Sequence, residues 1–289
     1  MLRLAAFSGA LIDYSIHEAM AITADLGFDG IEIACREPHL SPASSLERVR
    51  EMRNIAEGYG LEIPVLAGYM GHFSTISDAE CEVAYDQFQA LLERAEILES
   101  NMVRVFPGGP NAFLAADYHY EKAAFWIRKC AEQASAAGKR IVLEIHNISL
   151  IETEVSARRL IQMIDHDSVG LIHDAGNMYI TDTEFGEESV RGLGRDLLHV
   201  HIKDEKRIRE GGAPGSFKNV TRHGNEFFMQ CRLGEGDVDH SGLLRELKAQ
   251  AYDGWLTLEC AAPYPPKERL AYDMKIIREW LQAVEVNEG

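Results

Sequence analysis

The feature of this sequence that most constrains its fold is the alternation of short apolar runs with longer amphipathic segments. Eight apolar runs, bounded by residues such as Gly, Pro and Asp, have the length and composition of β-strands. They cover residues 2–8, 30–34, 62–67, 102–106, 141–146, 169–173, 197–202 and 255–260. Strands that alternate with helices are typical of βα units around a parallel sheet, and eight such units predict a (β/α)8 barrel.

The segments between these runs have the periodicity of outer helices, with apolar residues near i, i+3, i+4 and i+7. Gly60 and Gly138 follow two of them at the position where a left-handed helix cap favours glycine. Residues 27–33 and 251–259 resemble each other as a helix exit, a tight turn and a strand, which supports a repeated architecture. The predicted helices are residues 15–26, 45–59, 79–98, 120–137, 154–164, 241–251 and 266–284.

Length and charge narrow the class of protein further. A chain of 289 residues fits one TIM barrel, so we expect a single α/β domain over residues 1–289. The net charge of -17 repels phosphate backbones and anionic lipids, which argues against nucleic acid and membrane partners. Five cysteines without a C-x-x-C pair indicate reduced thiols, and the N-terminal apolar stretch is too short for a secretory signal. A cytoplasmic protein is expected.

One long segment, residues 204–239, lacks a clear helical or strand pattern and is rich in Gly and in charges of both signs. Loops beyond about 15 residues in a compact domain are usually functional. Because this segment follows the seventh predicted strand, we expect it to be a long loop over the catalytic face of the barrel.

Polar side chains occur inside four of the predicted strands, always near the C-terminal end. Alternation along a strand places them on the face opposite to the apolar residues, toward the barrel interior. These residues are Glu144 with His146, Asp174, His199 with His201 and Lys203, and Thr257 with Glu259. A charge in such a place costs several kcal/mol unless it is paired or bound to a metal. Three carboxylates and one imidazole suit Mn2+, Mg2+, Co2+ or Zn2+.

A structural role is the alternative for each of these residues. The carboxylates could form a buried salt-bridge network with Lys203 or Arg104, and His201 could be a core histidine. The acids outnumber the inward-facing bases, and the H-x-H pattern lies beside the acid-bearing strands, so a metal site is favoured. Glu32 is either a substrate contact or a structural acceptor, and His199 either supports the site or packs below it.

The motifs together resemble the xylose isomerase-like barrels, in the sugar phosphate isomerase/epimerase branch that includes ketose 3-epimerases, inosose dehydratase and dehydroshikimate dehydratases. The resemblance is carried by the order of LEIHN (143–147), LIHDAGN (171–177), HVHIKD (199–204), GEGDVD (234–239) and AYDGWLTLE (251–259). It implies one divalent metal ion, with Mn2+ the first choice, held by Glu144, Asp174, His201 and Glu259.

The chemistry that the resemblance implies is proton abstraction next to a carbonyl, with Glu144, Glu259 and His146 as the catalytic residues. Return of the proton gives epimerisation or isomerisation, whereas loss of a leaving group gives dehydration. Epimerases of this group often have a histidine three positions after the aspartate, where this chain has Asn177. The leading prediction is an isomerase or epimerase of a sugar or cyclic polyol ketone, and a dehydratase or lyase follows closely.

Substrate recognition is expected from residues around the mouth of the barrel, although simple solvation is the alternative for charges on a loop. The candidates are His72, Asn177, Lys203, Arg207 and Arg232, with His223 beside them. An apurinic endonuclease and a barrel without catalytic activity are more remote alternatives. The expected partner is a small sugar or polyol, and a homo-oligomer is possible from this sequence.

Overall fold

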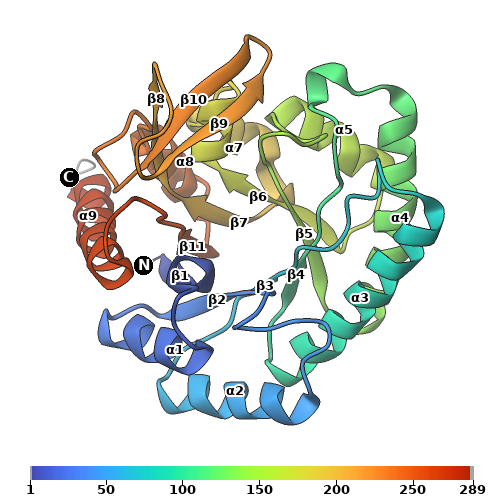
Figure 1. Ribbon diagram of the computed structural model, residues 1–289, viewed down its shortest axis with the longest axis horizontal. Helices are drawn as coiled ribbons and strands as arrows, with labels where there is room; N and C mark the ends of the chain where they lie inside the picture. The colour runs from blue at the N-terminus through green and yellow to red at the C-terminus, as the bar shows by residue number, and fades with distance from the viewer. Residues whose placement is uncertain (1, 287–289) are drawn as a thin grey trace.

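A computed structural model describes residues 2–286, and it contains a closed barrel of eight parallel strands, as Figure 1 shows. The strands lie in the order β1-β11-β7-β6-β5-β4-β3-β2 around the ring. Their bounds are β1 Arg3–Phe7, β2 Gly30–Ala34, β3 Val65–Ala67, β4 Met102–Arg104, β5 Arg140–Glu144, β6 Val169–Asp174, β7 Leu197–Ile202 and β11 Trp255–Leu258. The prediction of a single (β/α)8 barrel is confirmed.

Helices surround the barrel on its outer side (Figure 1). The bounds are α1 Ile16–Asp25, α2 Leu46–Gly58, α3 Asp78–Ile97, α4 Asp117–Ala136, α5 Glu154–Ile164, α6 Ala175–Ile180, α7 Glu187–Leu193, α8 Ser241–Ala249 and α9 Pro266–Val286. Gly60 and Gly138 have φ values of 69° and 65°, so the predicted left-handed caps are confirmed. None of the helices within residues 2–286 is long and apolar enough to cross a membrane.

Side-chain alternation along the strands divides the core into an outer and an inner part. Leu143 and the other residues that face the helices belong to one large apolar cluster. Val65, Val142 and Ile172 form a separate apolar layer inside the barrel. Glu144 follows Val142 on the same face of β5, and Asp174 follows Ile172 on β6, so the polar side chains lie one layer closer to the C-terminal ends of the strands.

Residues 204–239 differ from the expected irregular loop, because they contain a three-stranded antiparallel sheet. Its strands are β8 Asp204–Ile208, β9 Ser216–Thr221 and β10 Gly224–Cys231, with β10 in the centre. Of the charged residues that suggested a solvated loop, Arg207 and Lys218 are exposed, where an antiparallel sheet tolerates them, whereas Asp204 and Glu205 at the start of β8 are buried. The two short helices α6 and α7 after β6 were also absent from the sequence prediction.

The small sheet packs on the loops that follow the barrel strands. The side-chain amide of Asn147, after β5, donates to Oδ1 of Asn219 on β9 at 3.0 Å. Asn111, after β4, donates to the carbonyl oxygen of Val220 at 3.1 Å. Since both loops lie at the C-terminal ends of their strands, the sheet is attached to that end of the barrel, where Figure 1 shows it above β6 and β7.

Candidate metal centre and active site

Four acidic or imidazole side chains from four strands converge at the C-terminal end of the barrel. They are Glu144 at the end of β5, Asp174 at the end of β6, His201 on β7 and Glu259 directly after β11. Each offers one ligand atom, and these atoms all lie within 4.8 Å of one another. The structure therefore brings together the four residues that the sequence suggested as metal ligands, and their role as ligands stays a prediction.

Glu144 is enclosed by hydrogen-bond donors. The guanidinium of Arg104 on β4 lies 2.5 Å from its Oε2, and the amide of Asn177 donates to its Oε1 at 3.1 Å. Burial alone would raise the pKa of Glu144, but Arg104 and then His201 outweigh it and hold this pKa well below its usual range. Arg104 itself is buried beneath the rings of Tyr69 and Phe106.

Lys203, two residues beyond His201 on the same face, carries a second positive charge into the cluster. Its Nζ lies 2.9 Å from Oδ2 of Asp174 and 3.3 Å from Oε2 of Glu259, and it donates to Oδ1 of Asn177 at 3.0 Å. Burial opposes its charge, yet the carboxylates of Asp174 and Glu259 raise the pKa of Lys203 well above its usual value. Lys203 therefore remains an ammonium group inside the site.

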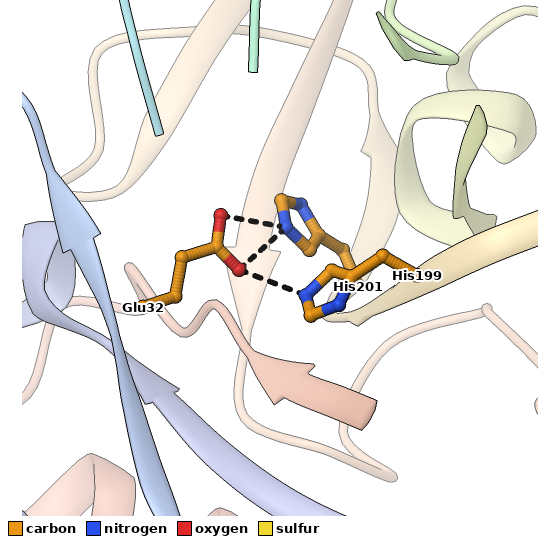
Figure 2. Close-up of side chains that lie close together, drawn as sticks. All are labelled: Glu32, His199 and His201. Atoms are coloured by element: carbon orange, nitrogen blue, oxygen red, sulfur yellow. Dashed lines mark hydrogen bonds and ion pairs between the residues drawn. The ribbon is translucent and has the colours of Figure 1, made fainter. Parts of the chain in front are cut away.

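His201 is held on one side of its ring and open on the other. Its Nε2 lies 3.1 Å and 3.2 Å from the two carboxylate oxygens of Glu32 on β2, as Figure 2 shows. Its Nδ1 is buried and has no hydrogen-bond partner among residues 2–286. This atom lies 3.3 Å from Oε1 of Glu144, 3.7 Å from Oδ2 of Asp174 and 3.5 Å from Oε2 of Glu259. Burial opposes a charge on this ring, but Glu32 and then Glu144 raise the pKa of His201 well above its usual value. Nδ1 is thus a place for a cation, either a proton on the ring or a divalent metal ion, and the oxygen and nitrogen donor set fits the metal ion.

The two glutamates of the cluster differ in access. The side chain of Glu144 is 2% exposed, whereas that of Glu259 is 19% exposed. Burial would raise the pKa of Glu259, but Lys203 and His201 lower it, so the carboxylate is ionised at neutral pH. Glu259 is thus the carboxylate of this set that a small molecule in the barrel mouth can reach.

Aromatic and imidazole rings line the mouth above Glu144. His146 is half-buried, and its ring meets Phe106 edge-on, with the centroids 5.8 Å apart. Nδ1 of His146 donates to the carbonyl oxygen of Asn147 at 2.7 Å, which leaves Nε2 without a partner among the described residues. His72 stacks on the other side of Phe106 at 5.4 Å, and burial lowers its pKa, helped by the charge of His146. His72, His146 and Phe106 therefore form one group at the mouth.

The predicted substrate residues divide into two sets. Asn177 and Lys203 lie in the cluster, and His72 lies at the mouth. Arg207 instead pairs with Asp182 at 2.9 Å and with Glu226 at 3.1 Å. Arg207 is thus engaged in ion pairs outside the cluster.

Arg232 lies outside the cluster as well. It pairs with Glu235 at 2.6 Å, and its guanidinium lies 4.0 Å from the ring centroid of Tyr264 and 4.1 Å from that of Tyr272. His223 is also engaged elsewhere, 3.2 Å from Asp182. Sequence reasoning placed these side chains near the substrate because their segment follows β7, whereas the antiparallel pairing of β8, β9 and β10 turns them to other partners.

The fold is a TIM barrel, and it carries an acidic, histidine-containing cluster at the C-terminal ends of its strands. The chain belongs to one family of such barrels. The model of the xylose isomerase-like TIM barrel family matches residues 20–280.

Inosose dehydratases are among the curated relatives. That of Lacticaseibacillus casei is 26% identical over 148 residues, which are 50% of this chain and 47% of the relative. That of Clostridium botulinum (strain Alaska E43 / Type E3) is 23% identical over 277 residues, 90% of this chain and 87% of the relative. The chain thus spans about half the length of some of the relatives it matches and most of the length of others.

Solved structures of three other proteins share the fold. An L-ribulose 3-epimerase has a TM-score of 0.79 at 19% identity and covers 100% of this chain and 97% of its own. The probable 3-DHS dehydratase AsbF of Bacillus anthracis has a TM-score of 0.77 at 19% identity, over 96% and 99% of the two chains. The IolI protein with a zinc atom has a TM-score of 0.79 at 15% identity, over 98% and 99%.

Proposed function

We propose that this protein is a divalent-metal-dependent dehydratase that removes the proton next to the carbonyl of a sugar or cyclic polyol ketone and expels water. The choice of reaction rests on one observation, which is that Glu144 and Glu259 differ in their hydrogen-bond partners and in their exposure. Arg104 and Asn177 occupy both oxygens of Glu144, while Glu259 is open to the mouth. Transfer of protons between two carboxylates on opposite faces of a substrate requires both to be free, whereas an elimination requires one base and a separate acid.

The four side chains Glu144, Asp174, His201 and Glu259 would hold the metal ion. A bound divalent cation would supply Lewis-acid polarisation of the ketone oxygen. The surroundings of Nδ1 of His201 support this assignment, because oxygens of three carboxylates lie within 3.7 Å of this nitrogen. We favour Mn2+, with Mg2+, Co2+ and Zn2+ as the other candidates for a mixed oxygen and nitrogen site.

The protein's own groups supply the remaining steps. Glu259 accepts the proton from the carbon next to the carbonyl, and the ammonium of Lys203 stabilises the negative charge that develops on the substrate oxygen. His146, whose Nε2 has no partner among the described residues, gives a proton to the departing hydroxyl. The C–H and C–O bonds break, a carbon–carbon double bond forms, and one water molecule leaves.

A sugar or polyol ketone is supported as the substrate class by relatives named inosose dehydratases, of which one aligns with 90% of this chain. The site agrees with such a substrate. Hydroxyl-rich molecules need a dense set of donors and acceptors, which Asn177, Lys203 and Glu259 supply around the cluster.

An epimerase is the second candidate, and one observation favours it. Oxygens of Glu144 and Glu259 lie 3.3 Å and 3.5 Å from Nδ1 of His201, so two carboxylates adjoin the proposed metal. For epimerisation by this pair, Arg104 would have to release Oε2 of Glu144 during turnover.

A substrate screen in D2O separates the two reactions. The purified protein with added Mn2+ is incubated with inososes, dehydroshikimate, ketoses and 3-keto-glycosides, and products are followed by mass spectrometry and NMR. We expect loss of one water from a cyclic polyol ketone. A product that gains one deuterium next to the carbonyl and keeps all its oxygens would assign the epimerase. Neither loss of water nor uptake of deuterium with any of these ketones would contradict both reactions.

A further inference from the structure

Behind the candidate metal centre lies a second buried group, which consists of Glu32 on β2, His199 on β7 and Thr257 on β11. All three side chains are fully buried. Nε2 of His199 lies 2.9 Å from Oε2 of Glu32 and 2.8 Å from Oγ1 of Thr257. The same oxygen of Glu32 lies 3.1 Å from Nε2 of His201. Figure 2 shows both imidazoles turned toward this one carboxylate.

This position excludes the substrate role that the sequence left open for Glu32. The carboxylate has no exposed surface, and His201 lies between it and the proposed metal. Burial of an isolated carboxylate is costly, and here two imidazole N–H groups compensate for it. Glu32 therefore acts through His201 and does not contact a substrate.

We propose that Glu32 is a positioning residue that fixes His201 in the tautomer with hydrogen on Nε2, so that the Nδ1 lone pair points at the metal. This inference rests on the proposed metal centre. A neutral imidazole can bind a metal through one nitrogen only if the hydrogen is on the other, and the hydrogen-bond partner of that other nitrogen selects the tautomer.

The choice of tautomer matters in this site because His201 has an acceptor on each side. Nδ1 lies 3.3 Å from Oε1 of Glu144, so a ring with hydrogen on Nδ1 could donate to Glu144 and would then have no lone pair for the metal. Glu32, on the opposite side, competes for that hydrogen. His199 holds the carboxylate of Glu32 in place through its Nε2, and the same nitrogen contacts Oγ1 of Thr257.

A second metal ion between Glu32, His199 and His201 is the competing explanation, because three ligand atoms of these residues lie within 4.8 Å of one another. The N–O distances of 2.9 to 3.2 Å are those of hydrogen bonds. A second ion would also require both nitrogens of His201 to coordinate metal at once. Hydrogen bonds account for the arrangement without that requirement, and metal stoichiometry distinguishes the two.

The experiment compares the wild-type protein with Glu32→Gln and with the matched control Glu152→Gln. Glu152 is also buried near the C-terminal end of the barrel, but it bonds Asn111 and the backbone N–H groups of Ala112 and Ile148. Mn2+ affinity and stoichiometry are measured by calorimetry and elemental analysis, and the histidine tautomers by 15N NMR of the Zn2+-loaded protein.

We expect one Mn2+ per wild-type chain, with hydrogen on Nε2 of His201. Glu32→Gln should raise the dissociation constant for Mn2+ about 10- to 100-fold, as loss of the partner of a metal-bound histidine typically does. Glu152→Gln should lower thermal stability without changing this constant. The NMR measurement on the wild-type protein tests the proposal even if Glu32→Gln does not fold.

Four results would overturn the inference. Coordination of His201 through Nε2 in the wild type, or an unchanged dissociation constant in a folded Glu32→Gln, would contradict it while the metal centre stands. Two Mn2+ per chain, one of them lost in Glu32→Gln, would assign the group to a second metal site. A wild-type protein that binds neither Mn2+ nor Zn2+ would end the proposed function and this inference together.

Discussion

Arg104 determines how Glu144 can behave, because it is the buried cation that compensates for this carboxylate. Arg104→Met keeps much of the side-chain volume beneath Tyr69 and Phe106 but leaves Oε2 of Glu144 without its partner. Breaking one partner of a buried ion pair typically costs about 3 to 5 kcal/mol. We expect the metal-free variant to lose about that much unfolding free energy in urea titrations and to recover part of it with Mn2+. Equal stability of variant and wild type would show that Glu144 does not depend on Arg104.

His146 is the residue whose replacement separates the two proposed reactions. Its imidazole lies beyond the four proposed ligands, with Nε2 unpartnered, so His146→Asn should leave metal binding intact. In a dehydratase the variant should lose at least about 100-fold in kcat, as removal of a general acid typically does. His72→Asn is the matched control, since His72 stacks on the same Phe106, and it should change KM more than kcat. A His146→Asn enzyme with normal kcat would favour the epimerase.

At the scale of single elements, the turn from α8 into β11 carries strain that its counterpart between α1 and β2 avoids. Ala251 has a φ of 52°, whereas the corresponding Gly27 has a φ of 77°. A left-handed conformation costs a residue with a Cβ about 1 to 2 kcal/mol, and glycine adopts it freely. Ala251→Gly should therefore raise the free energy of unfolding by up to about 1 kcal/mol in a denaturant titration. A decrease would mean that the Ala251 side chain contributes packing that outweighs the strain.

The barrel strands could be predicted because each is a short apolar run bounded by residues such as Gly, Pro or Asp. The candidate site could be predicted from the polar residues that interrupt these runs. Glu144, His201 and Glu259 interrupt apolar strands near their C-terminal ends, and parallel strands bring those ends together. Once eight strands are recognised, convergence of these side chains requires no further information.

Other contacts depend on three-dimensional relations that no local pattern encodes. Arg104 meets Glu144 because β4 pairs with β5 in a register that aligns Arg104 with Val142. The small sheet was missed because β8 and β10 mix charged and apolar residues without strict alternation, and they pair although all of β9 lies between them in the sequence. The ion pairs of Arg207 and Arg232 could not be predicted for the same reason.

At the scale of the whole molecule, a buried neutral histidine makes stability depend on pH. His240 stacks on Trp280 at 5.5 Å, and burial lowers its pKa to about 4. The unfolded chain takes up this proton below about pH 6.5, so stability present above that pH is lost as the pH falls toward 4, by up to about 3 kcal/mol. His240→Phe keeps an aromatic ring on Trp280, and its Tm should fall less than that of the wild type between pH 7 and pH 4.5. A parallel decrease would exclude His240 as a source of the acid sensitivity.

Metal binding should be visible in the stability of the whole barrel. A ligand that binds only the folded state adds RT ln(1 + [L]/Kd), which is about 2.7 kcal/mol at 100 times Kd. Calorimetric scans with increasing Mn2+ should therefore show a rising Tm, and a chelator should reverse it. Glu259→Gln should remain folded but lose most of this increase together with the activity. A fully active, metal-free Glu259→Gln protein would contradict the proposed centre.

The arrangement of strands around the ring also sets the order of events when a new molecule is made. β1 pairs with both β2 and β11, so the first and last strands of the barrel are neighbours. Glu32 and His199 are 167 positions apart, and Glu259 is synthesised after both. A chain still emerging from the ribosome therefore lacks part of the proposed metal centre and part of the group that orients His201. If the proposed centre holds a metal ion, only a finished barrel can acquire it, so the metal supply of the cell would act on this protein after its translation and not during it.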